Sequence, residues 1–143
     1  MEACVVFYRN EAGELRTIAG HHNREDGMTL FDFPEGEWKL SKVMIGNEVV
    51  SSYELEPYHQ VIIDKLRLAF QQAKWPMYSI GGRMWMQVWF PEGEHQERLQ
   101  SIGLDTHWVV LDSAVMQAAR LGLLTLSAVN TPSGMPSMVI GFQ

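Results

Sequence analysis

The sequence predicts a two-layer α+β domain, in which one long helix and two shorter ones cover mainly one face of a mixed, mostly antiparallel sheet. Short β-rich segments separated by turn residues fill the first half of the chain, an amphipathic helix follows, and helices mix with strands afterwards. The 143 residues, 46% hydrophobic and 20% charged, suffice for a single globular domain spanning 1–143. We expect one sheet of about six to eight strands.

The first half of the chain is rich in hairpin signals. The turn residues at 10–13 and Gly46-Asn47 each separate two runs of β-forming residues, as in antiparallel hairpins. The polar stretch at 20–27 is expected to be a loop, and Pro34 ends the strand that follows it. The strands predicted here lie at 4–8, 15–19, 28–33, 38–45 and 48–53.

The most regular predicted element is an amphipathic helix at 57–74. Pro57 is tolerated at a first helical position, and the helix ends before Trp75-Pro76. His59 is expected on an exposed turn of this helix. Apolar residues recur at three- and four-residue spacing and form one stripe that a sheet must cover. They are Tyr58, Ile62, Leu66, Ala69, Phe70 and Ala73.

The remainder of the chain predicts alternating strands and helices. Alternation over His107, Val109 and Leu111 indicates a strand at 107–111, with His107 on an apolar face as a core histidine. Asp112 or Ser113 would cap the next helix. The other predicted elements are a strand at 83–90, a helix at 94–101, the end of the capped helix at Gly122, and strands at 123–129 and 137–142.

One pentapeptide occurs twice, as Phe33-Pro-Glu-Gly-Glu37 and as Phe90-Pro-Glu-Gly-Glu94, each time after a predicted strand. The similarity ends almost at once outside these residues, whereas a structural repeat needs a longer matching period. Proline and glycine two positions apart also satisfy common turn requirements. We therefore favour reused turn chemistry over a duplication.

Charge and cysteine content limit the classes of partner. The net charge of −6, with scattered basic residues, argues against binding to nucleic acid or to an anionic membrane. The single cysteine, Cys4, allows no internal disulfide, and the N-terminus has no secretory signal, so we expect the cytoplasm. Cys4 itself is predicted to be a buried small hydrophobe.

The strand at 83–90 carries the main functional signal, because both of its faces are bulky. Met84, Met86, Val88 and Phe90 point one way and are typical of a core. The opposite face has three interpretations: packing beneath a helix, a pocket for a small apolar or planar ligand, or a subunit contact. Its residues, the ligand-binding candidates, are Arg83, Trp85, Gln87 and Trp89.

We therefore predict a non-catalytic binding or interaction module that takes a small apolar or planar ligand or forms a homodimer. No GxSxG, GxGxxG, P-loop, HExxH or CxxC pattern occurs, so no catalytic residue, metal ligand or cofactor is assigned. The alternative is a small hydrolase or transferase that uses His107, or the His21/His22 loop with Glu25 and Asp26. Histidine beside a carboxylate can exchange protons near neutral pH.

Overall fold

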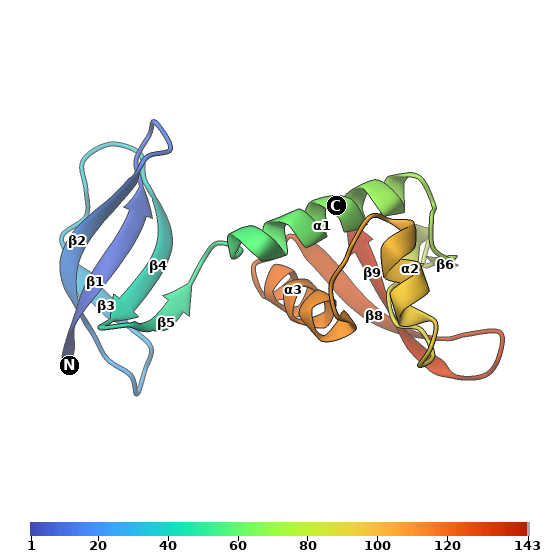
Figure 1. Ribbon diagram of the computed structural model, residues 1–143. Coiled ribbons are helices and arrows are strands. Elements are labelled where there is room, and N and C mark those ends of the chain that lie inside the picture. The colour runs from blue at the N-terminus through green and yellow to red at the C-terminus, as the bar shows by residue number, and fades with distance from the viewer. Residues whose placement is uncertain (143) are drawn as a thin grey trace. The chain divides into compact units, whose positions relative to one another are not determined.

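The predicted strands form two antiparallel sheets rather than one. The structure, a computed structural model that describes residues 1–142, is 25% helical and 38% strand, with three helices, so the α+β class is confirmed. By its internal contacts the chain forms two units, a first unit Met1–Glu54 and a second unit that begins at Leu55. Each unit contains one sheet (Figure 1).

The first unit is a five-stranded antiparallel sheet in the order β3-β2-β1-β4-β5. Its small core consists of Cys4, Val6 and Val43, which alternate with more exposed residues along β1 and β4, as the period of a strand requires. The strands are β1 (Glu2–Arg9), β2 (Leu15–His22), β3 (Thr29–Phe31), β4 (Lys39–Ile45) and β5 (Glu48–Ser52).

The prediction of a loop at 20–27 was wrong at its first residues. All eight residues of β1 pair with β2, which carries β2 on to His22, and His22 then pairs with Thr29 of β3. His22 is buried, and its Nδ1 lies 2.8 Å from the Thr29 Oγ1. Cys4 is buried as predicted, and burial raises the pKa of its thiol.

The loop after β2 is fastened to the sheet by one guanidinium. Arg24 Nε lies 2.6 Å from a carboxylate oxygen of Glu2, and Nη2 lies 2.9 Å from one of Glu48. The hydrogen bond from Arg24, aided by its charge, holds the pKa of Glu48 below its ordinary value. Arg24 thus joins the start of β1 to the start of β5.

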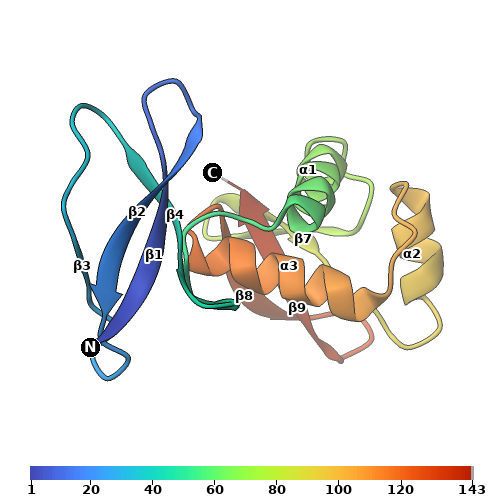
Figure 2. The same cartoon turned by 60° about the vertical axis from the view of Figure 1, so that its left-hand side comes forward.

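The second unit is a four-stranded antiparallel sheet in the order β6-β7-β9-β8. Figures 1 and 2 show α1 and α3 on the same side of this sheet. The core lies between them and includes Leu66, Val115, Met86 and Ile140, all fully buried. The elements are α1 (Pro57–Gln71), β6 (Met77–Ile80), β7 (Arg83–Gln87), α2 (His95–Ser101), α3 (Trp108–Arg120), β8 (Leu124–Asn130) and β9 (Pro136–Phe142).

The predicted strand at 107–111 was wrong, because this segment begins α3. His107 is the exposed N-cap of α3, and its Nδ1 accepts a hydrogen bond from the Val109 backbone N–H at 3.2 Å. His107 therefore replaces Asp112 and Ser113 as the cap. The apolar residues of this stretch recur at helical spacing, with Leu111, Ala114, Val115 and Ala118 buried.

Helix α1 confirms the long amphipathic helix, although it ends three residues before the predicted 74. Two of its residues were misplaced: Tyr58 is exposed, whereas His59 is buried with its Nδ1 2.6 Å from the Gln117 Oε1 of α3. This part-buried contact joins the two helices. Within residues 1–142, no helix combines the length and apolar character that a membrane span requires.

Strand β7 is shorter than the predicted 83–90 and ends at Gln87. Only Met86 and Gln87 of β7 pair with β9, so Met84 lies beyond that ladder and is exposed rather than in the core. Its other neighbour, β6, was not predicted. Four residues after Pro76 are too few for a clear pattern.

The Arg24 bridge predicts how the Glu48 carboxyl responds to acid. Its pKa is lower in the folded than in the unfolded chain, so ionised Glu48 stabilises the fold above the unfolded pKa. This contribution disappears as the pH falls through the folded pKa. Substituting Arg24→Gln should raise the Glu48 pKa toward its ordinary value, as followed by a carboxyl NMR titration. The matched change Arg16→Gln removes a different pair, with Glu14, and should leave Glu48 unaffected. An unchanged Glu48 pKa in Arg24→Gln would contradict the bridge.

Candidate functional site: the cleft around Trp89

The first two predicted site residues pack against each other and against the sheet. The guanidinium carbon of Arg83 lies 5.3 Å from the centre of a Trp85 ring. Trp85 lies flat on β9 at Gly141, where a Cβ atom would come within 3.3 Å of the indole. The Trp85 Nε1 is buried and, among residues 1–142, has no hydrogen-bond partner. Arg83 and Trp85 thus pack on each other and on β9.

Gln87 is buried, and both the oxygen and the nitrogen of its side-chain amide form a hydrogen bond. Its Oε1 accepts a hydrogen bond from the Tyr78 hydroxyl at 3.1 Å, and its Nε2 donates to the backbone carbonyl of Trp89 at 2.7 Å. The Ser137 hydroxyl of β9 donates to the same carbonyl at 2.7 Å. These bonds replace the regular ladder where β7 ends and fix the backbone of Trp89.

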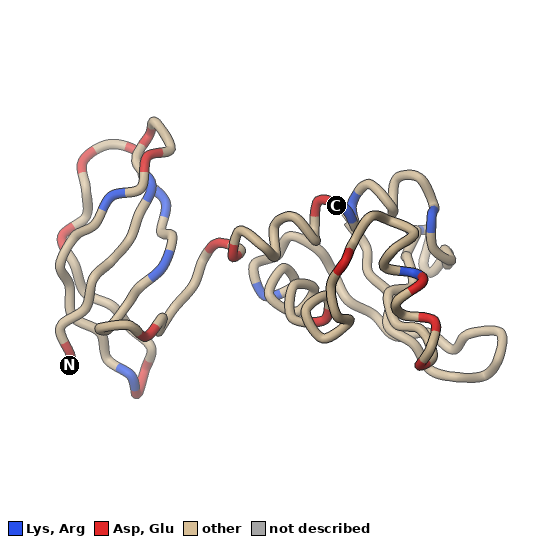
Figure 3. The backbone as a smooth tube through the Cα atoms, viewed as in Figure 1, with Lys and Arg blue, Asp and Glu red and all other residues tan. Residues whose placement is uncertain are grey.

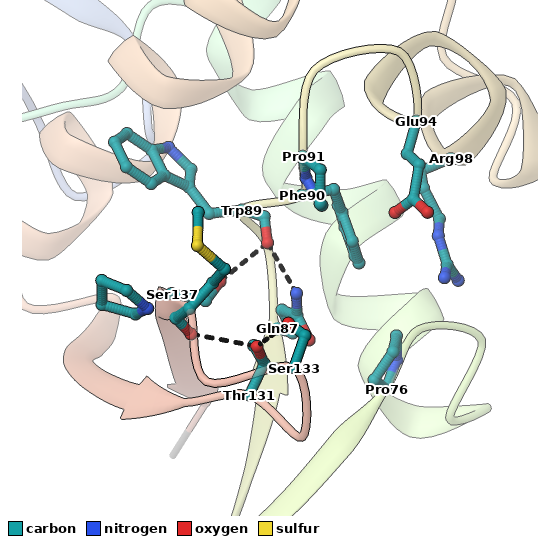
Figure 4. A pocket seen from close by; sticks show the side chains of 12 residues that line it. Pro76, Gln87, Trp89, Phe90, Pro91, Glu94, Arg98, Thr131, Ser133 and Ser137 are labelled. Carbon is teal, nitrogen blue, oxygen red and sulfur yellow. Dashed lines mark hydrogen bonds between the residues drawn. The ribbon is translucent and has the colours of Figure 1, made fainter.

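The indole of Trp89 is held at its far end too. Its Nε1 donates to a carboxylate oxygen of Asp112 on α3 at 3.2 Å. The side chain nevertheless remains 44% exposed. In Figure 4 the rings of Trp89 and Phe90 point to opposite sides of the chain. Trp89 is therefore an oriented, accessible ring.

A hollow of about 560 Å³ lies beside Trp89 at the end of the sheet. Its walls come from the end of β7, from α2, from Pro76 before β6 and from the loop between β8 and β9 (Figure 4). A second hollow of about 390 Å³ is lined by Leu126, Ala128 and Met138 of β8 and β9. Trp89, Pro136 and Ser137 line both hollows.

Besides the buried Gln87 and Ser137, the larger hollow has exposed and half-exposed polar groups, which we call its rim. Thr131 Oγ1 and Ser133 Oγ are 2.8 Å apart on the β8–β9 loop. Across the hollow, the guanidinium of Arg98 lies over the Phe90 ring, 4.6 Å from its centre, with Glu94 one helical turn before it on α2. The cleft can therefore sandwich a flat apolar group and meet a polar edge with hydroxyls or a guanidinium.

The sequence found part of this site. Gln87 and Trp89 line the larger hollow, whereas Arg83 and Trp85 line neither hollow. Sequence reasoning missed the anchor Asp112 and the loop residues 131–136. Only folding brings these segments to Trp89, because they lie more than 20 positions away along the chain. The Gly- and Pro-rich loop at 130–136 was a visible turn signal, but it pointed to no particular strand end.

The structure offers the alternative enzyme site little support. His22 and His107 form local contacts with Thr29 and with the Val109 backbone, and the Asp26 carboxylate accepts from the Met28 backbone N–H. Within residues 1–142, no hydrogen bond joins His21, His22 or His107 to Glu25 or Asp26. Nowhere in residues 1–142 do three or more His, Cys, Asp or Glu side chains lie together so that they could hold a metal ion. The hydrolase or transferase remains a prediction without a supporting contact.

Comparison with known proteins adds no functional assignment. Neither protein-family models, nor curated proteins, nor solved structures yielded a match to this chain. Inference about function therefore starts from the cleft itself.

The Gln87 network predicts a stability effect. Substituting Gln87→Leu removes both bonds of the amide and leaves the Tyr78 hydroxyl and part of the Trp89 carbonyl unpaired. The expected loss is about 1–3 kcal/mol in the free energy of unfolding, measured by urea denaturation. The same substitution at the exposed Gln96 should change it by less than about 0.5 kcal/mol. Equal effects at the two positions would argue against the network.

Proposed function

We propose that the second unit is a binding module for a small, planar and largely apolar molecule, with Trp89 as its main contact. The observation that carries this proposal is an indole fixed at both ends yet 44% exposed, which lines two hollows. A ring whose role is only to stabilise the fold contributes most when it is fully buried, because the stabilising free energy comes from removing apolar surface from water. Holding Trp89 open forgoes part of that gain.

The size and lining of the cleft support this class of ligand. A volume of about 560 Å³ lies in the range of roughly 300–1,000 Å³ that is usual for small-molecule sites. Besides Trp89, the walls include Phe90 and Met135, and Met138 lines the smaller hollow. Methionine adapts to ligands of varied outline because its side chain is unbranched and flexible.

The polar rim favours a flat molecule with one hydrogen-bonding or anionic edge. No acidic residue within the described chain forms an ion pair with Arg98, so its guanidinium can meet a carboxylate or a ring oxygen. Glu94 limits the total negative charge that the ligand can bring. No acid–base pair is proposed in the cleft, and we infer binding without turnover.

Binding can be tested with 2-naphthol and naphthalene-2-carboxylate as probes. Either probe should shift the Trp89 indole N–H resonance, and Trp89→Ala should weaken binding about 10-fold through loss of the aromatic contact. Trp108→Ala removes an exposed indole that lines neither hollow, so it is the matched control and should bind like the unchanged protein. If Arg98 binds the anionic edge of the ligand, Arg98→Gln should lower the affinity for naphthalene-2-carboxylate and leave the affinity for 2-naphthol unchanged. Equal affinity of Trp89→Ala and the unchanged protein would refute the site.

Homodimer formation is a second candidate, favoured by strand β8. This edge strand has seven residues in unbroken register with β9 and contains no charge, proline or glycine. Proteins usually protect exposed edges with such residues or with short strands, and the opposite edge, β6, has only four residues. An antiparallel pair of β8 strands about a two-fold axis would extend the sheet across both copies. We place either function in the reducing cytoplasm, because Cys4 is a buried free thiol.

Light scattering across a concentration series tests the dimer. The unchanged protein should reach twice the monomer mass, and Ser127→Lys on β8 should remain monomeric because a charge on the edge opposes strand addition. Ser79→Lys on β6 is the matched control and should dimerise like the unchanged protein. A monomer at every concentration would exclude this candidate without affecting the ligand site.

A further inference from the structure

Three aromatic rings form a group at the end of β3 and in the segment that joins β3 to β4 in the first unit. Phe31 and Trp38 are half-buried, and Phe33 is exposed. Phe31, Phe33 and Trp38 contact one another, with ring centres 5.1 to 5.7 Å apart. Phe33 is 72% exposed, the most of any large hydrophobic side chain within residues 1–142. The face of an aromatic ring carries partial negative charge, so an exposed ring such as Phe33 can attract a cation.

Acidic residues alternate with these rings along the chain. Asp32, Glu35 and Glu37 are all exposed, and Figure 3 shows the acidic positions on this loop. The ion pairs formed between residues of the 1–142 range include none of the three. The carboxylates and the ring faces attract the same kind of partner, because both interact favourably with a cation. We call residues 31–38 the aromatic–acidic segment.

The second copy of the pentapeptide shows which cation fits. There the guanidinium of Arg98 lies over the Phe90 ring, 4.6 Å from its centre. Trp75 covers another side of the ring at 5.4 Å between centres, so Phe90 is only 8% exposed. Phe33 occupies the same position of an identical pentapeptide, and no cation of the described chain lies over it. The first copy thus lacks the guanidinium that the second copy receives from its own helix.

Room for a peptide exists beside the segment. A hollow of about 690 Å³ is lined by Trp38, Glu37 and Gly36 on one side and by the β1–β2 turn, including Glu11, on the other. Two cations also line it: Arg9, which is paired with Glu54 at 2.7 Å, and the exposed Lys39. Glu11 and Glu37 balance these two cations, and of the three rings Trp38 is the one that lines the hollow.

We propose that the aromatic–acidic segment docks an arginine side chain from an extended segment of a partner protein. Arginine fits better than lysine, because its planar guanidinium stacks on a ring and at the same time donates in its plane to carboxylates. Docking would cover Phe33 as Arg98 covers Phe90. The site lies in the first unit, so it is independent of the cleft around Trp89.

The test uses the full chain and a capped pentapeptide with one arginine flanked by glycine and serine. Its binding should shift the Trp38 indole N–H resonance in NMR spectra, with saturation at millimolar concentration. The citrulline peptide, which keeps the shape but loses the charge, should bind at least about 10-fold more weakly, and the lysine peptide about 3-fold. Because Phe33 is exposed, Phe33→Leu should leave the fold intact and weaken binding about 3-fold.

Matched carboxylate variants separate a specific site from general acidity. The double variant Glu35→Gln, Glu37→Gln should weaken the arginine peptide about 4-fold, whereas Glu25→Gln, in the loop after β2, should leave it unchanged. Equal binding of the citrulline peptide, or an equal effect of Glu25→Gln, would overturn the proposal. The proposal would also be overturned if the peptide did not bind and the protein instead self-associated in a way that Phe33→Leu abolished. The occupant of the segment would then be a second copy of the chain. Naphthol binding at Trp89 is a separate readout, so either site can fail alone.

Discussion

The second unit depends on covering one face of its sheet with α1 and α3. Leu66 and Val115 from the helices and Met86 and Ile140 from the strands have no exposed surface, and Ala114 and Ala118 of α3 allow close approach. Truncating one such large side chain typically costs about 2–5 kcal/mol, against about 1 kcal/mol for an average hydrogen bond. Apolar packing therefore decides which face of β7 is buried, and hydrogen bonds act within that arrangement.

The cleft follows from where this packing stops. Strand β7 leaves the β9 ladder after Gln87, and the Trp89 carbonyl then needs partners other than backbone N–H groups. The Gln87 amide and the Ser137 hydroxyl supply them, while Asp112 of α3 supplies an acceptor for the indole. The three elements that meet at the strand end thus set the position of one ring. Because they belong to a rigid sheet and helix, the ring is oriented before any ligand arrives.

Sequence periodicity predicted the elements whose pattern is long and failed where it is short. The stripe of α1 spans several turns, so a helix was the sole interpretation. The segment at 107–111 shows alternation over five residues, but the same apolar residues continue into Ala114, Val115 and Ala118, which is the spacing of a helix. Of the four predicted site residues, only Gln87 and Trp89 line the larger hollow, for a related reason. Alternation gives the direction of a side chain only while the strand continues, and β7 ends before Trp89.

The repeated pentapeptide separates what a local sequence decides from what its surroundings decide. Gly36 and Gly93 both have positive φ, 78° and 95°, so each copy adopts a backbone conformation that favours glycine. The phenylalanines before these turns differ completely, because Trp75 and Arg98 cover Phe90 whereas Phe31 and Trp38 leave Phe33 open. Backbone chemistry is local and recurs with the residues, but burial comes from distant parts of the chain. Phe90 is covered by other residues of the chain, whereas Phe33, at the same position of the same motif, is not. The exposed Phe33 ring therefore marks a surface that another molecule can cover.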